Sequence, residues 1–217
     1  MEITYIGHSC FKIKTKSAII VTDPYDPKML GYRLPKLEAD LVTVSHSHPD
    51  HSNVSGLAIS KLAITTPGEF EALDVSVVGI STFHDLSDGS IRGKNTIFLI
   101  EADGFNLLHL GDLGHELSKE TLERLPEIDV LMIPVGGVFT IDSKLASKVI
   151  SSIEPGYVLP MHYQTPDLVG IPEKMDGIEK FLHEMGEDGL KPVEKLKVSG
   201  KSDIPDETEV VVLIPTH

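Results

Sequence analysis

The sequence predicts an α/β protein in which two β-sheets lie in the interior and helices cover their outer faces. Short runs of β-branched and apolar residues dominate the first and middle parts of the chain. Apolar residues at helical spacing are found mainly between the later strands. With 217 residues, the chain is long enough to bury a sizeable core. Because both halves mix strands with helices, we expect a single domain over residues 1–217.

The N-terminal part is predicted to form strands at 3–6, 11–13 and 18–22, where short β-rich runs are separated by turn residues or charges. A loop then opens at Asp23 and lasts until Leu41, where the next strand begins. A loop of this length is typical of a functional or lid-like segment. Further along we expect a short helix at 54–62, a strand at 62–66 and a helical turn or two at 68–73.

The later elements are predicted from alternation and from helical stripes. We expect strands at 75–83, 96–101, 105–110, 128–134, 156–160 and 210–214, and helices at 118–125, 142–153 and 171–185. Asp103 and Gly104 form a good hairpin turn between two of these strands. Ser118 is suited to cap the helix that follows it. The apolar stripes of the two longer helices predict contact with the core.

Charge and composition disfavour several kinds of partner. The chain has 33 acidic and 19 basic residues, which gives a net charge of −14. A broad nucleic-acid-binding face needs a basic surface, and an anionic membrane repels an acidic one. No apolar run approaches the roughly 18 residues that span a bilayer, and no signal-peptide pattern is evident. We therefore expect a cytoplasmic protein with a small-molecule substrate and without nucleic-acid or membrane partners; a homo-oligomer stays open.

A cluster of potential metal ligands follows the strand that begins at Leu41. It consists of His46, Ser47, His48, Pro49, Asp50 and His51. Imidazole and carboxylate groups suit Zn, Mn or Fe ions. Four donors in so short a segment cannot easily surround one tetrahedral ion, so two adjacent ions are the more natural interpretation. Paired ions indicate hydrolysis; the alternative is a polar surface loop that happens to be rich in histidine.

Three more candidate ligands follow other predicted strands. His84 ends the strand at 75–83, Asp112 follows the strand at 105–110, and His162 follows the strand at 156–160. Each residue alone could be an ordinary polar residue at the end of a strand. Together with the cluster they favour metal ligation, because the ends of their strands could converge on one rim.

These residues together resemble the binuclear metal-binding signature of metallo-β-lactamase-fold hydrolases. Other segments resemble the compact subgroup that is similar to L-ascorbate-6-phosphate lactonase, namely Gly7-His8-Ser9-Cys10, Asp23-Pro24, Pro134-Val135-Gly136-Gly137, Phe139-Thr140 and Met161-His162-Tyr163. The resemblance covers nearly the whole chain and implies a four-layer αββα sandwich of two mixed β-sheets with helices on the outer faces. It places the metals between loops at one edge and does not fix a substrate.

The resemblance also implies a role for each candidate ligand. By this analogy, His46, His48 and His84 hold the first ion, Asp50, His51 and His162 hold the second, and Asp112 bridges them. The implied cofactors are two divalent ions, Zn or Mn. A hydroxide between them is the implied nucleophile, because metals lower the pKa of bound water to near 7. Asp50 would both ligate an ion and orient that hydroxide as the catalytic residue.

Other side chains are weaker candidates. Asp23 is predicted to accept a hydrogen bond from a metal-bound imidazole, although it could equally be a turn residue before the following proline. His8, Thr140 and Tyr163 are placed near the site or on the substrate by the resemblance alone. We expect His109 to be a partly buried, hydrogen-bonded strand residue.

Four functions are compatible with this pattern. The first is a binuclear metal-dependent hydrolase of a small lactone, ester or phosphoester. The second is a phosphodiesterase or nuclease, similar to tRNA 3′-processing enzymes, but no RNA-gripping segment is obvious. The third is a redox protein, which the resemblance opposes because diiron relatives carry a carboxylate where His48 stands. The fourth is a metal-binding protein without turnover. We expect loops at 25–38, 85–94 and 164–172 to shape the pocket.

Overall fold

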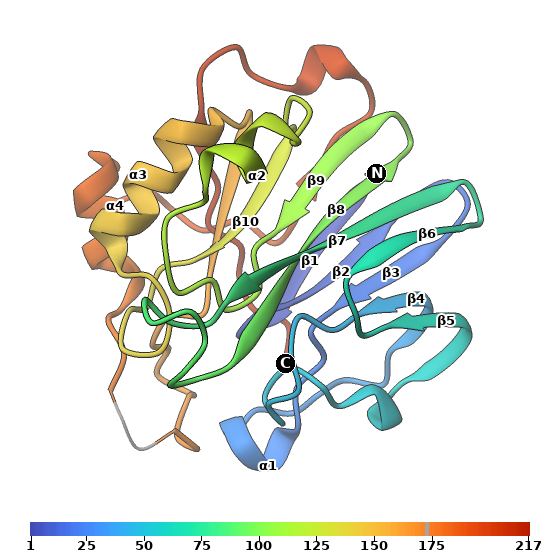
Figure 1. Cartoon of the computed structure of the whole chain (residues 1–217), viewed down its shortest axis with the longest axis horizontal. Coiled ribbons are helices and arrows are strands. Elements are labelled where there is room, and N and C mark those ends of the chain that lie inside the picture. Colours follow the sequence, from blue (N-terminus) through green and yellow to red (C-terminus); the bar gives the residue numbers. More distant parts are fainter. Residues whose placement is uncertain (172–173) are drawn as a thin grey trace.

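The computed structural model contains two β-sheets that pack face to face (Figure 1). The structure describes residues 1–171 and 174–217. Each sheet contains both parallel and antiparallel strand pairs, so the predicted α/β class with two mixed sheets is confirmed. Within the described residues, no helix has the length and apolar character needed to cross a bilayer.

The first sheet combines N-terminal strands with one strand from near the C-terminus, in the order β12-β1-β2-β3-β4-β5. The strands are β1 (Glu2–Gly7), β2 (Cys10–Lys14), β3 (Ile19–Thr22), β4 (Glu38–Thr43), β5 (Ala58–Ile64) and β12 (Leu196–Lys197). β2 is antiparallel to both β1 and β3, whereas β4 is parallel to β3. β1, β3 and β4 therefore end at the same edge of the sheet.

The second sheet has the order β13-β11-β10-β9-β8-β7-β6. Its strands are β6 (Gly68–Ala72), β7 (Val75–Phe83), β8 (Lys94–Ala102), β9 (Phe105–His109), β10 (Val130–Pro134), β11 (Tyr157–Met161) and β13 (Glu209–Val210). β8 is antiparallel to β7 and β9, and β10 is parallel to β9 and β11. β7, β9 and β11 therefore also end at a common edge.

Helices cover the second sheet more fully than the first. The helical segments are α1 (Pro27–Leu30), α2 (Lys119–Glu123), α3 (Ser143–Ile153), α4 (Ile178–Met185) and the 3₁₀ turns Val54–Gly56 and Lys201–Asp203. Figure 1 shows α2, α3 and α4 on the side of the second sheet. Over the first sheet, the short α1 and its flanking loop form a second apolar cluster that also includes Leu168 and Met175.

Side chains alternate between the two faces of the first sheet, so its strands contribute to two apolar clusters, one on each face. In β4, Leu41 belongs to the main core between the sheets, and its neighbour Val42 belongs to the cluster on the outer face. In β3, Ile20 and Val21 divide in the same way. Successive side chains of a strand point to opposite faces, so a continuous apolar run indicates a strand buried on both sides.

Three element predictions were wrong. The segment at 68–73, expected to be helical, is the strand β6, which pairs with β7 through a two-residue turn at Leu73 and Asp74. Both turn residues have positive φ, near 55°. This geometry is that of a type I′ hairpin turn, which usually contains Asn or Gly. The sequence signal was therefore absent. The helix expected at 54–62 is only a 3₁₀ turn followed by β5.

The helix expected at 171–185 begins only at Ile178. Of that range, residues 172 and 173 lie outside the described residues, and 174–177 are not helical. Met175 is buried in the outer cluster of the first sheet rather than in the helical stripe to which its spacing assigned it. The apolar spacing was therefore interpreted over too long a segment.

Candidate metal centre

Six strands, three from each sheet, end at one edge of the sandwich, and each is followed by polar side chains. These are His8 after β1, Asp23 after β3, the 46–51 loop after β4, His84 after β7, Asp112 after β9 and His162 after β11. Ligand sites in α/β proteins commonly lie beyond the carboxyl ends of strands, where successive loops meet. The topology thus brings together residues that are far apart in the sequence.

One group of donors consists of His46, His48 and His84. One ring nitrogen from each residue lies within 4.8 Å of the others. The side chains of His46 and His84 are buried, whereas His48 is exposed at the surface of the pocket. These are the three residues that the family resemblance assigned to a first ion.

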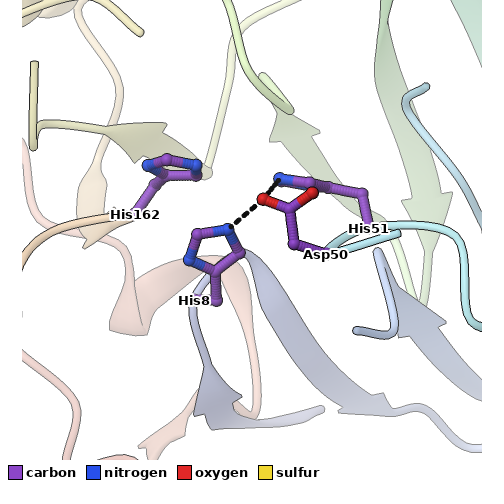
Figure 2. Close-up of side chains that lie close together, drawn as sticks. All are labelled: His8, Asp50, His51 and His162. Carbon is purple, nitrogen blue, oxygen red and sulfur yellow. Dashed lines mark hydrogen bonds and ion pairs between the residues drawn. The ribbon is translucent and has the colours of Figure 1, made fainter. Parts of the chain in front are cut away.

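A second group consists of His8, Asp50, His51 and His162, whose ligand atoms also lie within 4.8 Å of one another (Figure 2). The family resemblance assigned three of these residues, Asp50, His51 and His162, to a second ion. The fourth, His8, was placed only near the site. Its Nε2 lies 3.2 Å from Oδ2 of Asp50, and its ring centroid is 4.0 Å from that of His162.

Asp112 lies between the two groups. Its Oδ2 atom is 3.1 Å from Nε2 of His84 and 3.2 Å from Nε2 of both His51 and His162. Nε2 of His46 is 3.8 Å away. The Asp112 backbone N–H donates to the side-chain oxygen of Asn95, which fixes this turn. One carboxylate oxygen therefore contacts imidazoles from both groups.

Shifts in pKa favour neutral imidazoles at His8, His46 and His48 and ionised carboxylates at Asp50 and Asp112. Burial, assisted by the nearby His51, lowers the pKa of His46 to about 3. Burial opposes ionisation of Asp112, but the imidazoles of His162 and His51 outweigh it and hold the pKa of Asp112 well below its usual value. His51 is the exception, because the carboxylates of Asp112 and Asp50 outweigh burial and raise its pKa. A neutral imidazole has a lone pair free for a metal.

Several buried nitrogen and oxygen atoms of the site lack a hydrogen-bond partner in the part of the chain that the structure describes, and this pattern fits a metal-binding site. Nine buried side-chain polar atoms have no hydrogen-bond partner among the described residues, and seven of them belong to this site. They are Nδ1 of His8, Nε2 of His46, Nε2 of His51, Nδ1 of His84, Oδ1 of Asp112 and both ring nitrogens of His162. Buried polar groups are normally satisfied. Nitrogen and oxygen donors without protein partners fit divalent cations such as Zn²⁺ or Mn²⁺.

Asp23 holds His51 and the start of the 46–51 loop from behind. The buried carboxylate accepts hydrogen bonds from the backbone N–H of Ser45 at 2.8 Å and from its hydroxyl at 2.5 Å. Nδ1 of His51 lies 2.9 Å from the same carboxylate. A single proton on Nδ1, donated to Asp23, would leave the lone pair of Nε2, which faces Asp112, free for a metal. This contact is the one that the sequence proposed for Asp23.

We expect Asp23→Ala to weaken metal binding and lower kcat/KM by about 10- to 100-fold, because residues that orient a ligand typically contribute that much. Metal affinity should be measured by titration of the metal-free protein in buffers of defined free Zn²⁺. Asp40→Ala is the matched control, because Asp40 also accepts hydrogen bonds from a backbone N–H and a serine hydroxyl but lies outside the site. Equal metal affinity in both variants would contradict the orienting role of Asp23.

Three of the polar residues have a left-handed backbone conformation that residues other than glycine rarely adopt. His8, Asp23 and His162 have φ values of 59°, 36° and 54°, respectively. Left-handed conformations of residues other than glycine cluster at functional sites, where the surrounding structure holds them. The carbonyl of His8 is held by the hydroxyl of Tyr5 and by the backbone N–H of His162, both at 2.8 Å. The His8 turn and the His162 turn are thereby locked together.

Other histidines support the site without joining either group. Nε2 of His109 lies 2.9 Å from the carbonyl oxygen of Ser9, and the backbone N–H of Gly111 donates to Nδ1 of the same ring. His109 is hydrogen-bonded, as expected, but it is fully rather than partly buried. The backbone N–H of Phe83 donates to Nε2 of His115. Both rings thus brace the turns from which Asp112 and His84 project.

A cavity of about 320 Å³ opens beside the donors. It is lined by His48, Asp50, His84, Asp112 and His162, and by Met29, Arg92, Phe139, Gly170 and Ile171. Four of the last five lie on the loops expected to shape the pocket, and Phe139 belongs to the segment Phe139-Thr140 that the family resemblance named. The sequence did not single out Met29, Arg92, Gly170 or Ile171 as individual residues. The loop expected at 164–172 ends on a residue outside the described ones.

Thr140 and Tyr163 are not among the described residues that line this cavity. Thr140 is half-buried and its hydroxyl donates to the carbonyl of Ile141. Tyr163 is buried, and its ring centroid lies 6.3 Å from that of Tyr5. Their roles as substrate contacts stay predictions.

The chain matches one protein family and is similar to several known proteins. Residues 2–162 match the beta-lactamase superfamily domain. A UPF0173 metal-dependent hydrolase of Thermococcus onnurineus is 30% identical over 205 residues, which cover 80% of this chain and 90% of that protein. A UPF0173 metal-dependent hydrolase of Carboxydothermus hydrogenoformans is 28% identical and covers 76% of this chain and 85% of its own.

Among solved structures, a crystal structure from Thermotoga maritima is similar over almost the whole chain. It is a proposed Zn-dependent hydrolase of the metallo-β-lactamase superfamily, with 35% sequence identity and a TM-score of 0.78. The alignment covers 98% of this chain and 97% of that one. None of these three proteins is described as a lactonase of ascorbate 6-phosphate, so that likeness stays a prediction.

Proposed function

Because the chain belongs to the metallo-β-lactamase superfamily, in the family of UPF0173 metal-dependent hydrolases, we propose that it hydrolyses a small lactone, ester or phosphoester with two divalent ions. Zn and Mn are the proposed ions, because imidazole nitrogen and carboxylate oxygen suit both. A small-molecule substrate and a cytoplasmic location are part of the proposal.

The position of Asp112 is the observation that carries the proposal of two ions. Its Oδ2 atom contacts imidazoles of both donor groups, and its two oxygens could each face one cation. The proposed ligands of one ion are His46, His48 and His84, and those of the other are Asp50, His51 and His162. Asp112 would bridge the two ions, and its negative charge would reduce their mutual repulsion.

Bound cations would generate hydroxide at neutral pH and polarise the carbonyl or phosphoryl oxygen of the substrate. Asp50 is suited to orient the attacking water, because its side chain is 19% exposed and lines the cavity. His51 and the nearby His8 outweigh the burial of this carboxyl group and keep its pKa below the usual value, so it is ionised at neutral pH. It can therefore accept a hydrogen bond from water and hold it beside the substrate.

The second candidate, a nuclease, has less support. Arg92 is the one cationic side chain among the described residues that line the cavity. The chain as a whole carries a net charge of −14. Nucleic-acid phosphates normally require several Lys or Arg contacts along a groove.

We expect the metal-free protein to take up about two equivalents of Zn²⁺ or Mn²⁺ and then to hydrolyse members of a panel of lactones, carboxyl esters and phosphodiesters. His48→Ala should lower kcat/KM by more than about 100-fold, because a ligand should matter more than the residues that orient it. His183→Ala is the control, because His183 is exposed on α4 and its Nδ1 contacts Asp188 outside the site.

Several results would contradict the proposal. Turnover that persists after complete metal removal would exclude metal-dependent hydrolysis. Uptake of a single equivalent would exclude the pair of ions. Oxygen consumption by the iron-loaded protein without hydrolysis would favour a redox function, and RNA cleavage with steep salt dependence would favour a nuclease.

A further inference from the structure

Large apolar side chains are exposed around the mouth of the cavity. Among the described residues, seven large apolar side chains are exposed, and five of them lie on the segments that surround this cavity. These five are Met29, Leu86, Ile91, Val138 and Val169, with exposed fractions between 41% and 81%. Single exposed apolar residues need no explanation, but a group around one opening indicates a binding surface.

The residues form two apolar borders of the cavity. On one side, the backbone N–H groups of Val169 and Gly170 donate to the carbonyl of Leu30, so the segment around Val169 packs on α1, which carries Met29. On the other side, the guanidinium of Arg92 lies 5.3 Å from the centre of the Phe139 ring. This contact joins the 85–92 loop to the loop that follows β10.

The loop that carries Leu86 and Ile91 is held in a defined shape. The carboxylate of Asp85 accepts hydrogen bonds from four backbone N–H groups, those of Ser87, Gly89, Ile91 and Arg92, at 2.7–3.1 Å. Asp85 follows directly on the donor His84. The apolar side chains are therefore presented at a fixed place relative to the metal ligands.

The cavity itself divides into a polar end and an apolar end. The donor residues form one end, and Met29, Phe139 and Ile171 supply the apolar walls. Apart from the donors, Arg92 is the one polar side chain among the described lining residues. A polyhydroxylated substrate such as a sugar lactone would need several hydrogen-bonding groups in the wall, because its hydroxyls would otherwise be buried without partners.

We infer that the substrate is an ester or lactone with an apolar chain, whose carbonyl group lies at the donor end and whose chain lies along Met29, Phe139 and Ile171. This inference rests on the proposed hydrolase function and narrows its substrate class. In the reaction, water adds to the carbonyl carbon and the C–O bond to the leaving oxygen breaks. The products are a carboxylate, a hydroxyl group and a proton, and a lactone yields both groups on one molecule.

The test measures binding and turnover in parallel. The metal-loaded protein is titrated by calorimetry with butanoate, hexanoate and octanoate, the carboxylate products of the matching esters. Hydrolysis of the corresponding ethyl esters is measured below their micelle-forming concentrations. Burial of two more methylenes should tighten binding by up to about 15-fold. kcat/KM for the esters should rise in the same order.

Substitutions in the apolar wall of the cavity test whether that wall causes the dependence on chain length. In Met29→Ser and Phe139→Ser, the gain per two methylenes should fall below about threefold, while the metal content stays that of the native protein. Val193→Ser is the matched control, because Val193 is 45% exposed, close to the 41% of Met29, and lies outside the cavity. It should retain the full dependence on chain length.

The outcomes separate this inference from the function on which it rests. Affinity that does not change with chain length, or that changes equally in the wall variants and the native protein, would overturn the inference. Preferred hydrolysis of sugar lactones would also overturn it and leave the hydrolase function standing. Binding that tightens with chain length without any turnover would support the apolar wall and count against the hydrolase function.

Discussion

Asp112→Ala is expected to lose both metal ions and to lower kcat/KM by at least about 1,000-fold. The carboxylate is buried, and Oδ2 lies 3.1–3.2 Å from imidazoles of both donor groups. Its removal would delete the proposed bridge and leave two nearby cations without the negative charge that reduces their repulsion. Because the proposed nucleophile and the polarisation of the substrate both depend on the ions, little transition-state stabilisation would be left.

The measurements for this variant are metal content after gel filtration and steady-state kinetics on the best substrate of the panel. Asp129→Ala is the control, since Asp129 is also a buried carboxylate, directly before β10, but pairs with Lys201 outside the site. That variant should be less stable yet keep its metal. Two full equivalents of metal in Asp112→Ala would show that Asp112 is not a bridge.

Chelation is expected to lower the thermal unfolding midpoint by about 8–16 °C relative to the metal-loaded protein. A ligand at 1,000 times its Kd stabilises the native state by about 4 kcal/mol. For a chain of this size, each kcal/mol shifts Tm by about 2–4 °C. The physical reason is that the unpartnered atoms of the site, including Nε2 of His46 and His162, would gain partners when the proposed cations bind.

Differential scanning calorimetry with and without chelator tests this shift, and readdition of Zn²⁺ or Mn²⁺ should restore the higher Tm. The Asp112→Ala variant provides the internal control, because chelator should leave its Tm nearly unchanged. If the native protein is shown to lose its metal and its Tm does not move, the ions are not coupled to folding as the donor geometry requires.

Many of the strands could be predicted from the sequence, because the residue patterns that indicate strands are local. Continuous apolar runs such as 130–134 indicate strands buried on both faces, and β10 occupies that range. The candidate ligands could be found because Asp112 and His162 follow apolar runs and His84 follows an alternating strand pattern. The sequence indicated that these strand ends could converge on one rim, and the parallel arrangement that brings them together is seen only in the structure.

The parts that could not be predicted depend on contacts between distant residues. His8 joins the second donor group through Asp50, 42 positions away, and through a left-handed backbone that its residue type does not announce. The apolar wall consists of single residues such as Met29 and Phe139 on loops without a repeating pattern. The strand β6 was missed because its turn at Leu73 and Asp74 carries neither asparagine nor glycine.

The proposed metal ligands and the apolar walls of the cavity lie on different parts of the fold, so they can change independently during evolution. The proposed metal ligands follow the ends of four strands, β4, β7, β9 and β11, whereas the apolar walls belong to α1 and to the loops that carry Arg92, Phe139 and Ile171. Loops tolerate replacement and insertion far better than core strands do. New specificities can therefore arise by exchange of these loops while the chemistry is inherited intact, and relatives with the same donors need not share a substrate.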